Sequence, residues 1–214
     1  MPVFNETFFF DFLRPFKNDS RPLILDLRLN QGGSLSLTGH ILGVLLGGHQ
    51  PFALSLQADG KSADLTEIYP FASAQNQGSA LDIEATETHA HLKWLTPKDP
   101  PFVFKGPILL LSGGQNYSCG ELLTQALKET KRATIIGQKS AGAVLGAKDD
   151  FDCGMGYSLC LPFIELLSAQ GVSLVKTGVT IDSEMSFTEP ATTPLSRASI
   201  ETLLKRAKQN GHLS

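Results

Sequence analysis

The sequence predicts one α/β domain with a mostly parallel sheet flanked by helices. Two stretches share one order: a short apolar run, a glycine-rich turn, then helical periodicity. The first extends from Pro22 to Leu46 and the second from Pro107 to Arg132. Such strand–turn–helix units place parallel strands side by side with helices on their faces. A hydrophobic content of 42% in 214 residues suffices for one such core with room for an insertion.

Composition argues against several partners and leaves the thiols open. A net charge of −3 gives no case for nucleic-acid binding. No run reaches the roughly eighteen apolar residues of a membrane span, and no signal peptide opens this chain. The three cysteines allow one disulfide with one thiol left over. Cys153 and Cys160 either meet across a hairpin or are two buried free thiols.

The N-terminal elements are a helix, a strand and a second helix. Asn5 is suited to cap a helix through Phe16, and Pro15 ends or bends it. The apolar run Pro22 to Arg28 predicts a buried strand. Helical periodicity follows from about residue 36 to residue 46.

Residues 58 to 105 are interpreted as a variable insertion. A strand over Phe52 to Leu56 precedes them, but Gly, Ser, Asn, Gln and Pro then interrupt every apolar run. His89 and His91 share one strand face and would need a third ligand to hold a metal. No cysteine or carboxylate cluster accompanies them, which favours exposed histidines. The sequence therefore predicts no metal and no cofactor.

The central stretch places a serine on a strand-to-helix turn. Pro107 to Leu111 predicts a buried strand, and Ser118 stands three residues before Glu121, as in a capping box. Taken alone, this spacing fits a plain helix cap. The same position also puts a hydroxyl at the positive end of a helix, beside free N–H groups that suit an oxyanion.

Three C-terminal elements complete the prediction. Ala133 to Ile136 reads as a strand closed by Gly137. Turn glycines within Asp149 to Phe163 indicate a hairpin, and Ser196 to Gln209 is an amphipathic helix.

Two motifs in this order resemble the tail-specific, or C-terminal processing, serine peptidases and the related tricorn cores. Leu25 to Gly33 is similar to their Leu-Asp-Leu-Arg-x-Asn-x-Gly-Gly signature. Ser118 to Glu121 corresponds to the end of their Ser-Ala-Ser-Ala-Ser-Glu helix start. Arg132 to Ile136 and Gly137 to Gly142 match their basic-Ala strand and the loop after it. The resemblance implies a crotonase-like fold, and a core over residues 1–214 that is truncated at its N-terminus.

The resemblance also implies a function and a site. Ser118 takes the place of the nucleophile, which would cut peptides or unfolded proteins through an acyl-enzyme. Backbone groups of Gly32, Gly33 and Cys119 would form the oxyanion hole, although the glycines alone also fit a tight turn. The parent protein would be periplasmic or extracytoplasmic.

The residue at the position of the general base departs from the family pattern. Ala143 stands where the processing peptidases carry their catalytic lysine, and the neighbouring Lys139 and Lys148 fall on other positions. Tricorn-like members use an upstream histidine and a glutamate instead, but residues 174–177 hold no acid. The alternative is a catalytically impaired peptidase homologue that binds peptides or small hydrophobic ligands. An acyl-CoA-handling crotonase relative is a third interpretation, against which the Ser-Glu helix start argues.

Overall fold

A four-stranded parallel sheet carries the candidate site. The computed structural model describes residues 6–57, 83–85, 92–147, 151–187, 189–211 and 213. In this sheet β1, β5, β6 and β11 lie in that order, and every neighbouring pair is parallel. The bounds are Leu23–Asp26, Ile108–Ser112, Ala133–Gly137 and Ser183–Glu184. All five residues of β5 are buried, as expected for an inner strand. The predicted parallel sheet is confirmed.

A second, antiparallel sheet packs beside the first. Its order is β3, β4, β2, β10 and β7. The bounds are Ile83–Ala85, Leu92–Leu95, Pro51–Gln57, Pro162–Ser168 and Leu145–Ala147. The β4 strand lies in the stretch interpreted as an insertion, and its Trp94 is fully buried and donates to the Ser55 hydroxyl. The apolar runs of β2 and β4 are too short for their sequence to show which strands they pair with.

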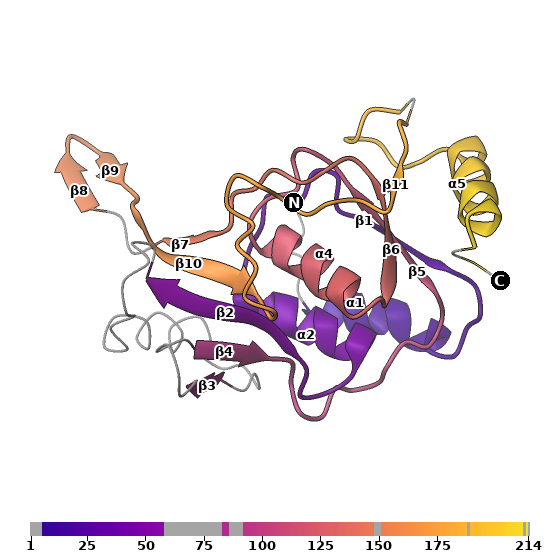
Figure 1. The fold of residues 1–214 in the computed structure, drawn as a ribbon, viewed down its shortest axis with the longest axis horizontal. Coiled ribbons are helices and arrows are strands. Elements are labelled where there is room, and N and C mark those ends of the chain that lie inside the picture. Colours follow the sequence, from indigo (N-terminus) through magenta and orange to yellow (C-terminus); the bar gives the residue numbers. More distant parts are fainter. Residues whose placement is uncertain are drawn as a thin grey trace.

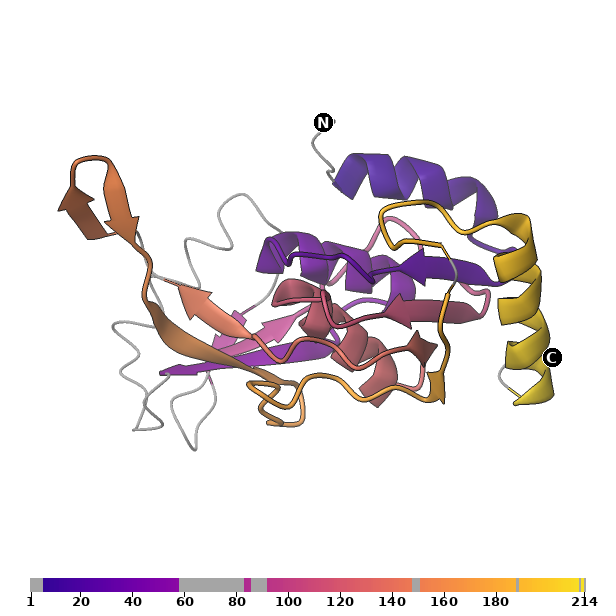
Figure 2. The ribbon, with the colours of Figure 1, turned by 90° about the horizontal axis from the view of Figure 1, so that it is seen from above.

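The helices cover both faces of the parallel sheet (Figures 1 and 2). The helices α2 and α4 share one apolar core with Leu110 of β5 and with the antiparallel sheet. Leu109 and Leu111 point to the other face, where they pack with α5. The helix α1 packs on α2 and continues into a 3₁₀ turn at Pro15. The helix bounds are Glu6–Leu13 for α1, Leu35–Leu46 for α2, Cys119–Glu129 for α4 and Arg197–Gln209 for α5.

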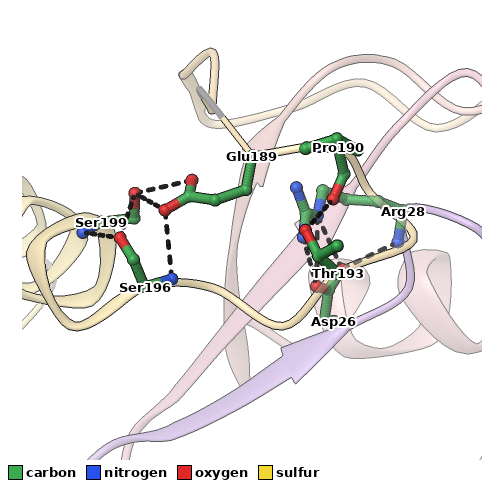
Figure 3. Close-up of polar contacts among 7 residues, drawn as sticks. All are labelled: Asp26, Arg28, Glu189, Pro190, Thr193, Ser196 and Ser199. Atoms are coloured by element: carbon green, nitrogen blue, oxygen red, sulfur yellow. Dashed lines mark hydrogen bonds and ion pairs between the residues drawn. The ribbon is translucent and has the colours of Figure 1, made fainter.

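Polar contacts organise the end of β1 and, beside it, the C-terminal segment before α5 (Figure 3). Asp26 and Arg28 form an ion pair at 2.7 Å, and the Arg28 guanidinium stacks 4.8 Å from the centroid of the Phe187 ring. The Glu189 carboxylate accepts from the Ser196 amide at 3.1 Å and from the Ser199 hydroxyl at 2.7 Å. Hydrogen bonds from these two serines lower the pKa of Glu189 to about 2. Asp26 and Arg28 are thus structural partners of each other.

The predicted hairpin is present and extends away from the body (Figure 1). It consists of β8 (Phe151–Gly154) and β9 (Tyr157–Leu159), whose side chains are exposed. Phe151 pairs with Leu159, so Cys153 does not face Cys160 across the ladder. Cys153 and Cys160 form no disulfide in the described part of the chain, and both are exposed. The structure therefore shows no disulfide, and the expected burial of the two thiols is wrong, because the hairpin extends away from the core.

In the part of the chain that the structure describes, every helix is too short or too polar to cross a membrane. His89 and His91 lie outside the described residues. Elsewhere in the described ranges, no three His, Cys, Asp or Glu side chains gather as a metal site would require.

Candidate active site

Ser118 occupies a strained turn between β5 and α4. Its backbone angles are φ 51° and ψ −121°, a conformation that residues other than glycine rarely adopt. Such a conformation costs on the order of 1–3 kcal/mol and persists only where surrounding contacts hold it. The Ser118 side chain is partly accessible to solvent. A strained, accessible serine at the positive end of a helix is suited to act as a nucleophile.

The loop after β1 lies directly against this turn. The Tyr117 amide donates to the Asn30 carbonyl oxygen at 2.8 Å, which joins the two loops. A Cβ on Gly32 would lie 2.7 Å from the Ser118 Cβ and 3.2 Å from its Oγ. Gly32 also has φ +93°, so both its space and its backbone require glycine. The structure therefore brings the two motifs of the sequence together at Ser118.

Two of the three predicted oxyanion residues have an available amide. The Gly32 amide is already occupied, because it donates to Asn30 Oδ1 at 2.9 Å. In the described turns and loops, no backbone carbonyl accepts from the Gly33 or Cys119 amide. The Cys119 thiol donates to the Gly33 carbonyl oxygen at 3.1 Å, which places these residues next to each other. Burial raises the pKa of this thiol, which keeps it protonated as a donor.

A buried carboxylate connects the nucleophile turn to the loop after β6. Glu121 is fully buried and reaches back to the Ser118 amide at 3.1 Å through Oε2, as the capping-box spacing predicted. The same oxygen accepts from the Ala143 amide at 2.8 Å. Oε1 accepts from the Ser140 hydroxyl and from the Gly142 amide, each at 2.6 Å. These four donors satisfy the carboxylate, and no basic side chain of the described residues pairs with it.

Further bonds fix the loop of residues 140–143 from its other side. The Ser140 hydroxyl accepts from the Val179 amide at 2.6 Å, and the Gly142 carbonyl accepts from the Lys176 amide at 2.7 Å. The Ala141 amide donates to the Asn116 carbonyl at 3.1 Å. Sequence reasoning missed that Glu121 organises this loop. The only signal was its spacing from Ser118, which by itself indicates a cap.

Ala143, at the position where the resemblance expects a catalytic lysine, lies beside Ser118. Because Ala143 and Ser118 donate to one Glu121 oxygen, their backbones lie on either side of a single atom. The Ala143 side chain is exposed and carries no proton acceptor. Lys139 is also exposed, and in the described part of the chain it forms no hydrogen bond with Ser118. Lys148, the other candidate base, lies outside the described residues.

Comparisons with known proteins give matches over most of the chain. The profile of peptidase family S41 matches residues 2–185. The photosystem II D1 C-terminal processing protease is 20% identical with a TM-score of 0.58, covering 93% of this chain and 42% of that one. Mature CPAF is 17% identical with a TM-score of 0.64, covering 97% and 48%. A putative S41 protease from Bacteroides fragilis is 18% identical with a TM-score of 0.61, covering 97% and 50%. The chain thus spans half or less of these structures, whose likeness shows the fold.

Proposed function

The chain belongs to peptidase family S41, and on that premise we propose that it is the core of a serine peptidase acting through an acyl-enzyme on Ser118. One observation carries the proposal. Ser118 sits on a strained turn at the start of α4, beside the Gly33 and Cys119 amides, which donate to no backbone carbonyl in the described loops. The substrates would be peptides or unfolded proteins. The extracytoplasmic location implied by the resemblance stays a prediction.

The proposed reaction begins when Ser118 Oγ attacks the carbonyl carbon of a peptide bond. The Gly33 and Cys119 amides would donate to the oxygen as it becomes negative. A base must take the hydroxyl proton and deliver it to the leaving amine. Water then attacks the ester on Ser118, and the acid product leaves. The protein's part is to hold two donors where the charge develops.

The base is the incomplete part of this proposal. The Ala143 methyl accepts no proton, so Lys139, Lys148 or a histidine upstream of this domain would have to act instead. Without a positioned base, an oxyanion hole and substrate binding alone leave an acceleration on the order of 10³ to 10⁴ over water. We therefore expect slow cleavage by this chain.

A second candidate function is a peptidase homologue that binds peptides or small hydrophobic ligands without cutting. The observation that favours it is the exposed methyl of Ala143 beside a fully ordered hydrogen-bond network. An intact cleft that lacks a proton acceptor would retain binding and lose turnover.

Incubation with casein, an unfolded protein, tests both candidates. Mass spectrometry would follow new termini, and a fluorescent casein peptide would report binding. We expect slow cleavage by the wild type, its loss in Ser118→Ala, and unchanged cleavage in Ser20→Ala, which alters an exposed serine away from the site. Binding without cleavage in all three proteins would select the binding homologue. Absence of both binding and cleavage would contradict both candidates.

A further inference from the structure

A cavity of about 840 Å³ lies at the end of the parallel sheet away from Ser118. The turns that precede β1 and β5 line it, at residues 18–22 and 105–107, together with one side of α5 and Leu213. Ser118 instead follows β5, so the cavity and the candidate active site lie at opposite ends of the same strands. Figure 2 shows α5 at one end of the molecule and the β8–β9 hairpin at the other. The cavity is therefore separate from the site at Ser118.

Close packing fixes the walls of this cavity. A Cβ on Gly106 would lie 2.5 Å from the Asp19 carbonyl oxygen and 2.9 Å from that of Arg21, so the two turns are in direct contact. Leu204 and Leu213 pack against the apolar cluster between α5 and the sheet, which anchors the opposite wall. A cavity whose walls are already ordered loses less conformational entropy when a ligand binds.

The cavity carries an excess of positive charge. Its described lining includes four cationic side chains but only two carboxylates, although the chain as a whole has a net charge of −3. Both carboxylates already have a cation. The Asp19 carboxylate accepts from the Arg21 guanidinium at 2.9 Å, which lowers the pKa of Asp19 to about 2. Glu201 pairs with Arg197, which lies outside the lining, at 2.9 Å.

Three ammonium groups at the cavity remain without a carboxylate. Lys105 comes from the turn before β5, and Lys205 and Lys208 come from α5. Among the described residues, none of the three lysines forms an ion pair. Lys208, in the last turn of α5, also complements the negative end of the helix dipole, but Lys105 lies on no helix. Two separate elements thus bring cations to one cavity.

The chemistry of this lining selects a phosphate ester. An ammonium group is a compact charge with three donors, and several of them together favour an anion with more than one charge. A phosphate monoester carries a charge of about −1.5 to −2 at pH 7, whereas a carboxylate carries a single charge. Pro22, Pro107, Leu204 and Leu213 form the apolar part of the lining, where an organic group attached to the phosphate would leave water.

We propose that this cavity binds a phosphate monoester, with its phosphate held by Lys105, Lys205 and Lys208 and its organic group packed on the apolar part of the lining. The ester is either a soluble compound or a phospholipid headgroup, since both present the same phosphate chemistry. The inference is independent of the proposed function, because Ser118 and the two loops beside it are absent from the lining. The Ser118→Ala protein should therefore bind the ester as tightly as the wild type does.

Titration with phenyl phosphate, a small phosphate monoester, tests the proposal. Calorimetry in a phosphate-free buffer of low ionic strength would compare it with benzoate, which joins the same ring to a single charge. Phenyl phosphate should bind about tenfold more tightly than benzoate, because a larger charge faces the same lysines. Equal binding of the two compounds, or binding of neither, would overturn the proposal.

Charge reversal gives the matched comparison. Lys205→Glu places a carboxylate at the cavity and should weaken phenyl phosphate binding by about tenfold or more. Lys98→Glu makes the same change of net charge at an exposed lysine outside the lining, and should weaken binding by less than about twofold. Lys105→Glu, on the other wall, should reproduce the loss and replaces Lys205→Glu if thermal unfolding shows that variant to be unfolded. Equal losses at the cavity and at Lys98 would contradict the assignment, because they would indicate general attraction between charges.

Vesicles distinguish the two sources of the phosphate. Co-sedimentation would be measured with phosphatidylcholine vesicles that either contain or lack phosphatidic acid, itself a phosphate monoester. Binding that requires phosphatidic acid and is lost in Lys205→Glu would support the proposal with a lipid headgroup as the ligand. Binding of phenyl phosphate without binding of either vesicle would support it with a soluble ester.

Discussion

The two loops that flank Ser118 are both held in place by hydrogen bonds, but they differ in the chemical groups that they bring to Ser118. The loop after β1 brings Gly32 against Ser118, and no backbone carbonyl of the described loops accepts from its Gly33 amide. The loop of residues 140–143 is held by Glu121, Ser140 and the segment at Val179. At its end, however, stands the methyl group of Ala143. Under the proposed function, the loop after β1 would therefore supply a hydrogen-bond donor for an oxyanion. The loop of residues 140–143 would place a residue beside Ser118 that cannot act as a base.

In this architecture, the bonds that position the 140–143 loop are independent of the side chain at residue 143, where a base would transfer the proton. Glu121 holds the 140–143 loop through the amides of Gly142 and Ala143 and through the Ser140 hydroxyl. None of these bonds involves the side chain at position 143. Alanine is thus compatible with the loop conformation, and restoring a base there should leave the fold unchanged.

The largest expected effect comes from supplying the base. Ala143→Lys should increase Ser118-dependent peptide cleavage by about 10²- to 10⁴-fold, the usual contribution of a positioned general base. Hydrolysis of a fluorogenic apolar peptide would measure it. Ala143→Arg is the matched control, because guanidinium stays protonated and cannot accept the proton. No increase with lysine, or an equal increase with arginine, would show that position 143 is not the missing part.

The next effect concerns the carboxylate that joins the two loops. Glu121→Ala leaves four donors without their acceptor, two of them on buried residues of the 140–143 loop, and should lower the free energy of unfolding by about 3 kcal/mol or more. Urea denaturation at neutral pH gives the value. Glu201→Ala, which removes an exposed carboxylate on α5, should change it by less than about 0.5 kcal/mol. Equal effects of the two substitutions would contradict the role of Glu121.

A smaller effect should separate the adjacent glycines. Both have positive φ, so alanine strains either backbone by on the order of 1 kcal/mol or more. Only at Gly32 would the added Cβ also collide with Ser118, whereas at Gly33 it would meet no atom within 4 Å. Gly32→Ala should therefore lower the free energy of unfolding more than Gly33→Ala does. The reverse order would mean that Gly32 does not contact the nucleophile as described.

The smallest expected effect concerns the pKa of Glu189, which lies away from both loops and serves as a reference. Hydrogen bonds from Ser196 and Ser199 lower the pKa of Glu189 to about 2, below its ordinary value of 4.5. A lowered carboxylate pKa adds stability that is fully present above about pH 4.5 and is lost as pH falls toward 2. Ser199→Ala should raise the pKa of Glu189 and flatten this acid dependence, as a carboxylate NMR titration would show. An unchanged pKa of Glu189 would contradict its hydrogen bond with Ser199. The reactivity of Ser118 at pH 7 should be the same in this variant as in the wild type.

Local sequence patterns were sufficient for the elements of the parallel sheet. The runs at Pro22 and Pro107 are apolar, short and followed by glycine, and the structure contains β1 and β5 there. The sequence also singled out Ser118 and Gly32, and the structure brings these two residues together, while their chemical roles stay predictions. The pairing of β2 with β4 and β10 was not predicted, since such pairing depends on contacts between residues far apart in the chain.

The same dependence on contacts between distant residues explains why the sequence did not predict the role of Glu121 or the cavity beside Cys119. Spacing revealed one bond of Glu121, to Ser118, but its partners at 140–143 lie about twenty residues away and meet it only after β6 has formed. A cavity of about 640 Å³ beside Gly33 and Cys119 is assembled from α1, β1, α2 and α4, so no single stretch contains it. Phe8 and Phe12 of α1 line this cavity, and their place there follows from packing.

The reactivity of Ser118 toward a fluorophosphonate is the most direct test of the central claim, that this site is built around a nucleophile without a base. Intact mass would follow labelling of the wild type, Ser118→Ala and Ala143→Lys. The account predicts slow, incomplete labelling of the wild type, none of Ser118→Ala, and rapid stoichiometric labelling of Ala143→Lys. Rapid stoichiometric labelling of the wild type that is lost in Ser118→Ala would contradict the claim, because it would show that a base already serves Ser118.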